Sequence, residues 1–553
     1  MTTTTIDGQE LKRLAEAGLK WLRMNQQIVN AYNVFPVPDG DTGTNMVLTM
    51  QSAYDEIGQS LEKSAGKMAQ ALAHGALMGA RGNSGVILSQ IWRGFARAVD
   101  DQEVIGVECL IKALSTARDT AYKGVVRPVE GTILTVTKDI ALAAKTAYEE
   151  AEKLGKTINI VEMFERIVKA ADESVQRTPE LLPVLKQAGV VDSGGKGLFF
   201  IFEGMLRYLH GESLEAAAVY HPIPITHFDE HVMDMVEDGQ DYEVVLDFVP
   251  TRALQWDDFY AQLEQFGTSI QIGEGEGMYR VHIHVPAEKR YHPIDYAISL
   301  GQVTKVVIEN LQTQMNESKP EGNNLHKFIQ NHIEEGQIGV IAISPGAGIS
   351  RVYSSLGAAA VVNGGQTMNP STQEILEAIE ELPTDKVIIL PNNKNIIMTA
   401  QSTKSLSQKK IAVIPSRSVP QGLAAMLHWN PEGDYEEIIE EMTSSLKAVR
   451  TCEITNATRS VEMNGVPVKE GQLIGLVDGE LLVSSTNLQD CCLQTLKAAQ
   501  AEDYELITLF YGAGLPKEEA ENIAAVIREA FPNQEVELQE GGQPHYPFII
   551  SVE

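Results

Sequence analysis

Hydrophobic residues recur every three or four positions through the first two hundred residues, which is the spacing of one buried helix face. The clearest examples are the runs Leu11 to Val29, Thr44 to Leu61, Lys67 to Met78 and Ile158 to Ser174. This pattern predicts an all-α bundle from Asp7 to about Gly211.

The pattern changes after His221-Pro-Ile-Pro, where short apolar runs alternate with amphipathic ones. Strands are expected at Tyr242 to Val249, weakly at Ser269 to Ile272, and at Tyr279 to Val285 and Thr304 to Ile308; helices are expected at Leu254 to Phe266 and His292 to Leu300. The order β-α-β-β-α-β predicts a small ferredoxin-like α+β domain. The polar stretch Gln314 to Asn324 is the best candidate for a linker after it.

Apolar runs of strand length then alternate with helical patterns, which favours a parallel α/β sheet. These runs are 339–344, 386–390 and 411–415, and a second mixed unit follows with strands near 472–484, 504–510 and 545–551. The chain is therefore expected to be multidomain, with domains at 1–212, 222–313 and 325–553, and the sequence leaves open whether the last is one domain or two.

Charge narrows the range of partners. The 553 residues include 44 Lys plus Arg and 75 Asp plus Glu, a net charge of −31, which disfavours broad binding to nucleic acid or to an anionic membrane. A phosphate ligand must then be held by metal ions, backbone N–H groups or a local cluster of donors.

The start of the chain lacks a basic and an apolar segment, and no run approaches the ~18 apolar residues of a spanning helix. The 4 cysteines form no C-x-x-C pair. We therefore expect a soluble, cytoplasmic protein.

The most informative segment is Asn33-Val-Phe-Pro-Val-Pro-Asp39-Gly-Asp41-Thr-Gly-Thr-Asn45-Met. The two X-Pro steps must end the preceding helix, so both aspartates lie on a sharp loop. Carboxylates two residues apart can converge on a hard cation such as Mg²⁺, with Asn33 adding a neutral oxygen. Thr42 or Thr44 can cap the next helix, whose N-terminus would face the same anion. The alternative is a simple turn with a helix cap.

Two glycine-rich segments could hold phosphate or nucleotide. Gly79-Ala-Arg-Gly82-Asn83-Ser84-Gly85 lets backbone N–H groups approach an anion, or is a tight turn between helices. Val191-Asp192-Ser193-Gly194-Gly195-Lys196-Gly197 has the glycine spacing of a P-loop with Gly189, but lysine is one position late and no Ser or Thr follows it. The segment is therefore not a Walker A phosphate-binding loop. Two interpretations remain: a loop that binds a nucleotide, and a loop that only connects two helices.

These segments, with Glu130-Gly131-Thr132 between them, together closely resemble bacterial fatty acid kinase. Its N-terminal domain is similar to the ATP-binding subunit of dihydroxyacetone kinase, an antiparallel eight-helix barrel. The resemblance implies that Asp39 and Asp41 are the essential pair that binds two Mg²⁺ under the ATP phosphates, and that Asn33 stands where the dihydroxyacetone enzymes have a third carboxylate. The residues implied to line the nucleotide are Thr42, Thr44, Asn45, Gly82, Asn83, Ser84, Thr132, Asp192, Gly194 and Gly195.

His282-Ile-His284 lies on a predicted strand, so both imidazoles share one face. As a bare motif, two strand histidines are more often surface or interface residues. The family has a His-x-His strand here, in some members paired with a cysteine that binds Zn²⁺. The matching stretch of this chain, Asp241-Tyr242-Glu243, has no cysteine; Glu243 could replace it as an oxygen ligand, or the histidines could act without metal.

Three polar loops follow predicted strands of the C-terminal third, at 344–348, 363–372 and 390–395. They can gather at one edge of the sheet as binding loops, and they can also be well-capped turns. They resemble the family's DegV-like C-terminal region, which implies docking of a DegV-like fatty-acid-binding carrier; dimerisation through the middle domain is implied as well.

The sequence therefore predicts an ATP-dependent phosphotransferase that acts on the carboxylate of a carrier-bound fatty acid and gives an acyl phosphate for phospholipid synthesis. The alternatives are a dihydroxyacetone-type kinase that acts on a triose, and a nucleotide-sensing regulator without catalysis.

Overall fold

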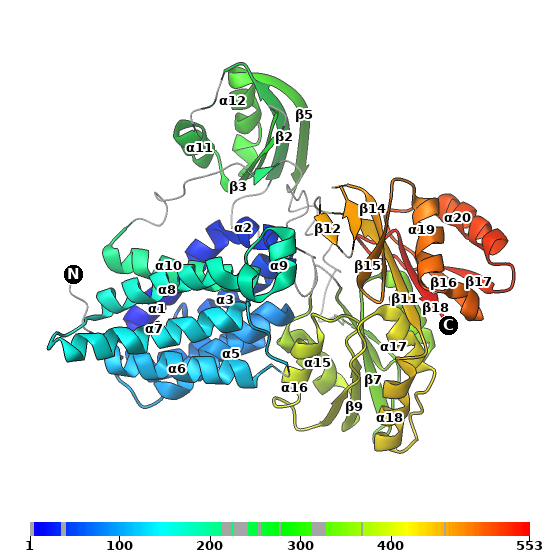
Figure 1. Cartoon of the computed structure of the whole chain (residues 1–553), viewed down its shortest axis with the longest axis horizontal. Helices are drawn as coiled ribbons and strands as arrows, with labels where there is room; N and C mark the ends of the chain where they lie inside the picture. Colours follow the sequence, from blue (N-terminus) through cyan, green and yellow to red (C-terminus); the bar gives the residue numbers. More distant parts are fainter. Residues whose placement is uncertain are drawn as a thin grey trace. The chain divides into compact units, whose positions relative to one another are not determined.

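The structure, a computed structural model, describes residues 5–34, 40–125, 127–212, 223–224, 242–252, 254, 256–275, 278–310, 328–365, 369–457, 461–463, 465–469 and 471–553. Its contacts divide the chain into two compact units (Figure 1). Unit 1 joins 1–217 to 326–553, and unit 2 is 218–325. The two ends of the sequence therefore belong to one body, although a separate domain is inserted between them.

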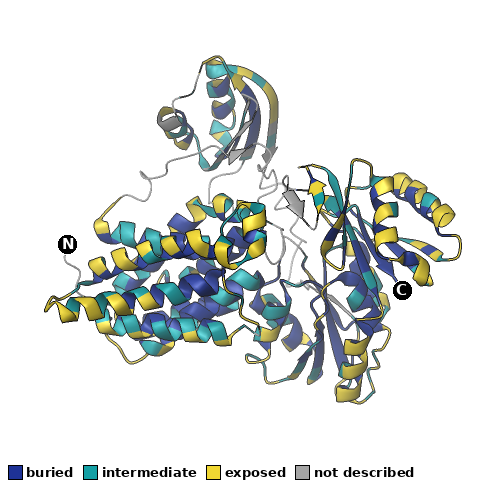
Figure 2. Cartoon of the chain, in the orientation of Figure 1, coloured by how far each residue is buried: buried dark blue, intermediate teal, exposed yellow. Residues whose placement is uncertain are grey.

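The first part of unit 1 is all helical, as the apolar periodicity predicts. Its helices are α1 (Gly8–Met24), α2 (Gln26–Ala31), α3 (Thr42–Ile57), α4 (Ala65–Met78), α5 (Gly82–Ala98), α6 (Val107–Lys123), α7 (Ile133–Lys153), α8 (Ile160–Leu181), α9 (Pro183–Ala188) and α10 (Ser193–His210). From α3 to α8 each helix packs against the next, α10 packs against α8, and α1 packs against both α10 and α3. The helices thereby surround one apolar core and turn their exposed faces outward (Figure 2).

Local sequence explains where several of these helices begin. The Asp7 carboxylate accepts a hydrogen bond from Glu10 N at the start of α1. Asn159 and Glu162 form a capping box at the start of α8, in which each side chain bonds the other residue's backbone N–H. Such caps satisfy N–H groups that have no partner within the helix.

The second part of unit 1 contains two sheets. The first, in the order β10-β9-β7-β8-β6, is parallel from β10 to β8 and antiparallel at β6. Its elements are β6 (Phe328–Gln330), β7 (Ile338–Ser344), α14 (Ala347–Ser355), β8 (Ala360–Asn363), α15 (Thr372–Glu381), β9 (Lys386–Leu390), α16 (Ile397–Thr403), β10 (Lys410–Val413), α17 (Val419–Met426) and α18 (Tyr435–Ser445). Every residue of β7 is buried, as expected for a central strand of a parallel sheet.

The other sheet has the order β15-β14-β11-β18-β16-β17 and is mainly antiparallel. Its elements are β11 (Arg450–Asn456), β14 (Leu473–Val477), β15 (Glu480–Ser485), α19 (Leu488–Ala498), β16 (Leu506–Tyr511), α20 (Lys517–Ala530), β17 (Glu535–Glu540) and β18 (Phe548–Val552). The small hairpin β12 (Val461–Met463) and β13 (Val466–Val468) adjoins it in sequence. The prediction missed β6, β8, β11, β12, β13 and β17.

Unit 2 has the predicted order of elements. These are β2 (Tyr242–Pro250), α11 (Trp256–Glu264), β3 (Thr268–Gly275), β4 (Met278–Val285), α12 (His292–Leu300) and β5 (Gly301–Asn310), preceded by the short strand β1 (Ile223–Pro224). The sheet order is β1-β3-β4-β2-β5, and β3, β4, β2 and β5 pair antiparallel. The predicted linker at 314–324 lies outside the described residues. Within the described part of the chain, every helix is too short or too polar to cross a bilayer.

Candidate functional site

The loop before α3 presents Asp41 differently from a simple capped turn. Asp41 occupies the N-cap position and is only 6% exposed, yet its carboxylate makes no capping hydrogen bond to α3. The cap comes instead from Asn30 of α2, whose Oδ1 accepts hydrogen bonds from Gly43 N (2.7 Å) and Thr44 N (3.2 Å). The Asp41 carboxylate is thereby kept for other partners.

One expectation for this loop is wrong, and another concerns a residue that the structure does not describe. We expected Thr42 or Thr44 to cap α3, and that is wrong, because the Asn30 side chain already takes the first N–H groups. The Thr44 hydroxyl accepts hydrogen bonds from Gln26 Nε2 (3.0 Å) and Asn30 Nδ2 (3.1 Å). Asp39 lies outside the described residues. Asn33, which follows α2, is buried.

The Gly79–Gly85 segment packs directly against the start of α3. Gly82 has φ +57°, and a Cβ added there would lie 2.6 Å from Asn45 Nδ2. A Cβ on Gly85 would lie 2.4 Å from Thr49 Oγ1. Only glycine allows the two segments to approach this closely. The approach brings the predicted nucleotide residues Asn45, Gly82 and half-buried Ser84 together at one end of α3 and α5.

The third predicted segment meets the same place through a hydroxyl pair. Ser193 Oγ donates a hydrogen bond to Thr42 Oγ1 over 3.2 Å, although the two residues are 151 positions apart. Asp192 caps α10 by accepting a hydrogen bond from Gly195 N over 2.7 Å. Burial raises the pKa of the Asp192 carboxyl to about 7, although the hydrogen bonds from backbone N–H groups lower it.

Thr132 has a local structural role as the N-cap of α7. Its hydroxyl accepts from Leu134 N over 3.4 Å and donates to Val129 O over 2.8 Å. The next residue, Ile133, packs on the turn that carries Asp192, since a Cβ on Gly194 would lie 3.3 Å from Ile133 Cβ. The predicted residues Thr132, Asp192, Gly194 and Gly195 are therefore neighbours in space.

The C-terminal α/β region of unit 1 reaches this group of loops directly. Asn369 Nδ2 donates a hydrogen bond to Asp41 Oδ2 over 2.6 Å, and Asn83 Nδ2 donates to Asn395 Oδ1 over 2.9 Å. Arg81 Nη1 donates to Asn369 O over 2.9 Å and pairs with Glu374 Oε2 at 3.1 Å. Asn369 and Asn395 lie on loops at the carboxyl ends of the parallel strands β8 and β9. This is the edge of the sheet where the sequence predicts binding loops.

Sequence reasoning missed the roles of Asn30, Arg81, Asn369 and Asn395. Asn369 and Asn395 do lie in loops that the sequence marks as polar and strand-following, which is the available signal. Their contacts to residues about 300 positions away leave no trace in a single sequence. The helix start after Asn369 was predictable: Ser371 and Glu374 form a capping box on α15.

For the predicted histidine site of unit 2, the structure describes the pairing of the strands but only one of the three side chains. In the pairing of β2 with β4, Glu243 stands opposite His284 and Val245 opposite His282. His284 is buried, whereas the side chains of Glu243 and His282 lie outside the described residues. Among the side chains that are described, no three His, Cys, Asp or Glu residues are grouped as a metal site would require. A second metal site therefore stays a prediction.

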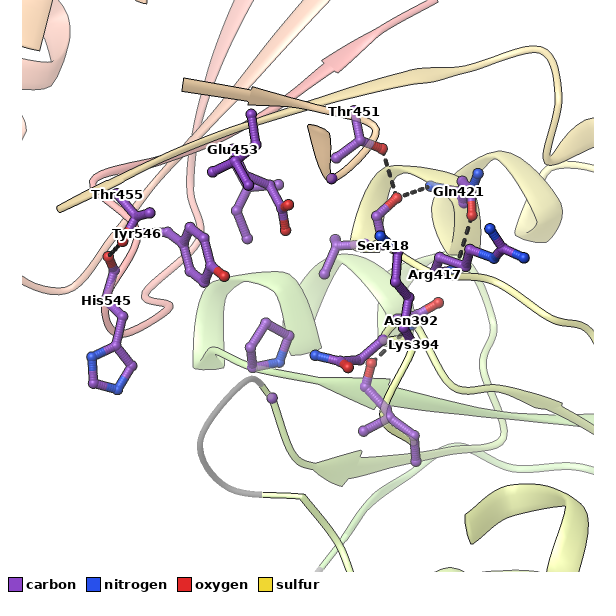
Figure 3. Close-up of a pocket in the computed structure, with 18 of the residues that line it drawn as sticks. Asn392, Lys394, Arg417, Ser418, Gln421, Thr451, Glu453, Thr455, His545 and Tyr546 are labelled. Carbon is purple, nitrogen blue, oxygen red and sulfur yellow. Dashed lines mark hydrogen bonds between the residues drawn. The ribbon is translucent and has the colours of Figure 1, made fainter. Parts of the chain in front are cut away.

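A cavity of 430 Å³ lies in the C-terminal α/β region (Figure 3). Polar side chains line it from both sheets, among them Asn392, Lys394, Arg417, Thr451 and Glu453. Burial raises the pKa of the Glu453 carboxyl, and the charge of Lys394 opposes this shift. The loop that contributes Asn392 and Lys394 to the cavity continues to Asn395, the partner of Asn83.

Comparisons with known proteins cover most of the chain. A family model described as "DAK2 domain" matches residues 36–207. The models for the middle domain and for the C-terminal domain of FakA-like fatty acid kinase proteins match 240–318 and 339–553.

Relatives are similar over the whole length. "Protein YloV" of Bacillus subtilis is 39% identical over 568 residues, covering 100% of both chains. An uncharacterized protein of Staphylococcus aureus (strain USA300) is 37% identical over 555 residues, covering 99% of both. Among solved structures, the Streptococcus pneumoniae fatty acid kinase (Fak) B3 protein loaded with linoleic acid matches 39% of this chain and 99% of its own, at 13% identity and a TM-score of 0.28.

Proposed function

The chain belongs to the FakA-like fatty acid kinase family, and we propose that it uses ATP to phosphorylate the carboxylate of a fatty acid, giving an acyl phosphate for phospholipid synthesis. The observation that carries this proposal is the position of Asp41. Its carboxylate is buried, is not used to cap its own helix, and lies where the loops predicted to line the nucleotide meet. A carboxylate held in this way is suited to a cation rather than to helix stability.

Three buried side chains offer oxygen donors of the kind that Mg²⁺ binds. Asp41 offers a carboxylate, Asn33 and Asn369 offer carboxamides, and all three are buried. Hard oxygen ligands of this kind suit Mg²⁺, which also keeps bonds to water and to substrate phosphates. We propose that Asp41 and Asp39 hold the metal and that, when bound, Mg²⁺ neutralises charge on the phosphates of ATP.

The residues of the chain itself would bind and orient the nucleotide. Gly82 has no side chain, so the start of α5 can approach an anion, and the buried Asn45 amide lies beside it as a donor. A fatty-acid carboxylate is already ionised at neutral pH. The transfer then needs no general base, and catalysis consists mainly of positioning and electrostatic stabilisation.

We further propose that a separate DegV-like carrier presents the fatty acid. The support is the match of residues 339–553 to the C-terminal model of the family. In this chain the same region contacts the kinase loops through Asn369 and Asn395. A carrier that docks on this region would hold its ligand close to the predicted phosphate-binding loops.

The test is ATP consumption with a fatty acid, in the presence and absence of a DegV-like carrier. We expect turnover that depends on the carrier and that is lost in Asp41→Ala and Asp39→Ala, with circular dichroism unchanged. Retained turnover in both variants would refute the assignment of the aspartates. Turnover with a triose instead of a fatty acid would identify a dihydroxyacetone-type kinase, and tight ATP binding without turnover would identify a regulator.

A further inference from the structure

Asn369 links the C-terminal α/β region to the proposed metal ligand. Its side chain is 1% exposed, and its Nδ2 donates the hydrogen bond to Asp41 Oδ2 at 2.6 Å. Hydrogen-bonding partners of metal-ligating carboxylates orient those ligands and tune their affinity. The position of Asn369 is therefore that of a residue which orients the Asp41 carboxylate.

The other end of the Asn369 carboxamide has no hydrogen-bond partner among the described residues. Oδ1 is buried there and makes no hydrogen bond within the part of the chain that the structure describes. An unsatisfied buried polar atom costs about 1–3 kcal/mol unless something fills the place next to it. The C–N and C=O bonds of an amide are only ~1.3 and ~1.2 Å long, so Oδ1 lies within about 5 Å of Asp41 Oδ2. A cation at Asp41, or a water bound to that cation, would satisfy this oxygen.

The backbone around Asn369 is fixed on the kinase loops. Arg81 Nη1 donates to Asn369 O over 2.9 Å, and Thr372 N donates to Ala80 O over 3.2 Å. The capping box of Ser371 and Glu374 begins α15 immediately afterwards, and Glu374 also pairs with Arg81. The backbone that carries the carboxamide is thus anchored by several contacts, as a residue that positions a metal ligand requires.

We propose that Asn369 is a positioning residue of the kinase centre, through which the C-terminal region completes the metal site of the helical domain. Nδ2 fixes the Asp41 carboxylate, and Oδ1 of the same amide would be available to the cation or to water bound to it. This inference rests on the proposed function, because it takes Asp41 as a metal ligand. It adds that the helical domain alone does not form the full site.

The experiment measures Mn²⁺ binding to the full-length protein without nucleotide, by electron paramagnetic resonance. Asn369→Ala is expected to weaken Mn²⁺ binding about 10- to 100-fold, the range for loss of a partner of a metal ligand. Asn395→Ala is the matched control, because it removes the other asparagine contact between the same two regions and leaves Asp41 untouched. We expect its Mn²⁺ affinity to stay within threefold of wild type.

A second variant separates metal positioning from structural support. Asn369→Asp places two carboxylates in contact, so they repel without metal and share a cation when it is present. We expect the melting temperature in chelator to fall below that of wild type, and added Mn²⁺ to raise it by more than in wild type. A structural role alone would lower the melting temperature equally with and without Mn²⁺, and that result overturns the proposal.

The outcomes also separate this inference from the proposed function. If wild type binds no Mn²⁺ and Asp41→Asn changes nothing, the metal site and the inference both fail. If wild type binds Mn²⁺, Asp41→Asn loses it and Asn369→Ala retains it, the proposed function stands and the role of Asn369 is refuted. If Asn369→Ala does not fold, as circular dichroism will show, the metal-dependent melting of Asn369→Asp decides.

Discussion

Replacing Gly82 with alanine tests whether the close approach of α3 and α5 builds the proposed nucleotide site. The new methyl would lie 2.6 Å from Asn45 Nδ2 and 3.2 Å from Asn45 Cγ, on a backbone with φ +57°. The left-handed backbone costs an alanine roughly 1–2 kcal/mol. The buried Asn45 amide must also move. If that amide donates to a charged phosphate, its loss costs about 1.5–3 kcal/mol, or roughly 10- to 150-fold in the Kd for nucleotide.

The assay is calorimetric titration of ADP in the presence of Mg²⁺. Gly155→Ala is the matched control, because Gly155 has φ +63° but no atom within 4 Å of an added Cβ. Both variants are expected to melt at a lower temperature than wild type, since they share the backbone strain. Gly155→Ala should bind ADP within twofold of wild type and Gly82→Ala at least tenfold more weakly. Equal ADP affinity in the two variants would refute the reasoning.

Three further predictions concern Asp192, Asn30 and Arg81. The folded pKa of Asp192 is raised from 3.8 to about 7, so its contribution to stability is full below pH 3.8 and is lost as the pH rises through about 7. The melting temperature of wild type should therefore fall more steeply across this range than that of Asp192→Asn; parallel curves would contradict the raised pKa. Asn30→Ala removes the cap of α3, worth about 1–2 kcal/mol, so hydrogen exchange at the amides that it caps should accelerate about 5- to 30-fold, and unchanged exchange would exclude this cap. A double-mutant cycle of Arg81→Ala and Glu374→Ala should give a coupling energy of about 0.2–1 kcal/mol in thermal unfolding, because the pair is partly exposed. Salt at about 1 M should reduce this coupling energy by screening, and an unchanged coupling energy would contradict the prediction.

Much of the fold could be predicted from local pattern. The spacing of apolar residues located most of the helical domain, and the alternation of strands and helices predicted the parallel sheet that contains β7 and β9. Two of the missed strands have clear reasons. β8 has only four residues, and β17 reads Glu-Val-Glu-Leu-Gln-Glu, in which charged residues outnumber apolar ones. Such strands are defined by their neighbours in the sheet rather than by their own sequence.

The candidate site was predicted in parts. The sequence marked the segments around Asp41, Gly82 and Asp192, because glycines and acids in that arrangement have few uses other than a turn or a ligand site. It assigned the cap of α3 to the wrong residues. A threonine next to a helix start is a good local candidate, and a sequence does not reveal that Asn30 of α2 occupies the same N–H groups.

The sequence by itself determined most of the elements and the chemical character of the loops, because helix period, caps, glycines and carboxylates act over a few residues. Only the tertiary structure decided that the two ends of the chain form one compact unit and that Asn369 meets Asp41 across 328 positions. The physical reason is that burial and long-range hydrogen bonding depend on which surfaces pack together. The same carboxylate can cap its own helix in one packing, whereas here it accepts a hydrogen bond from a distant amide, and that choice is made by the fold.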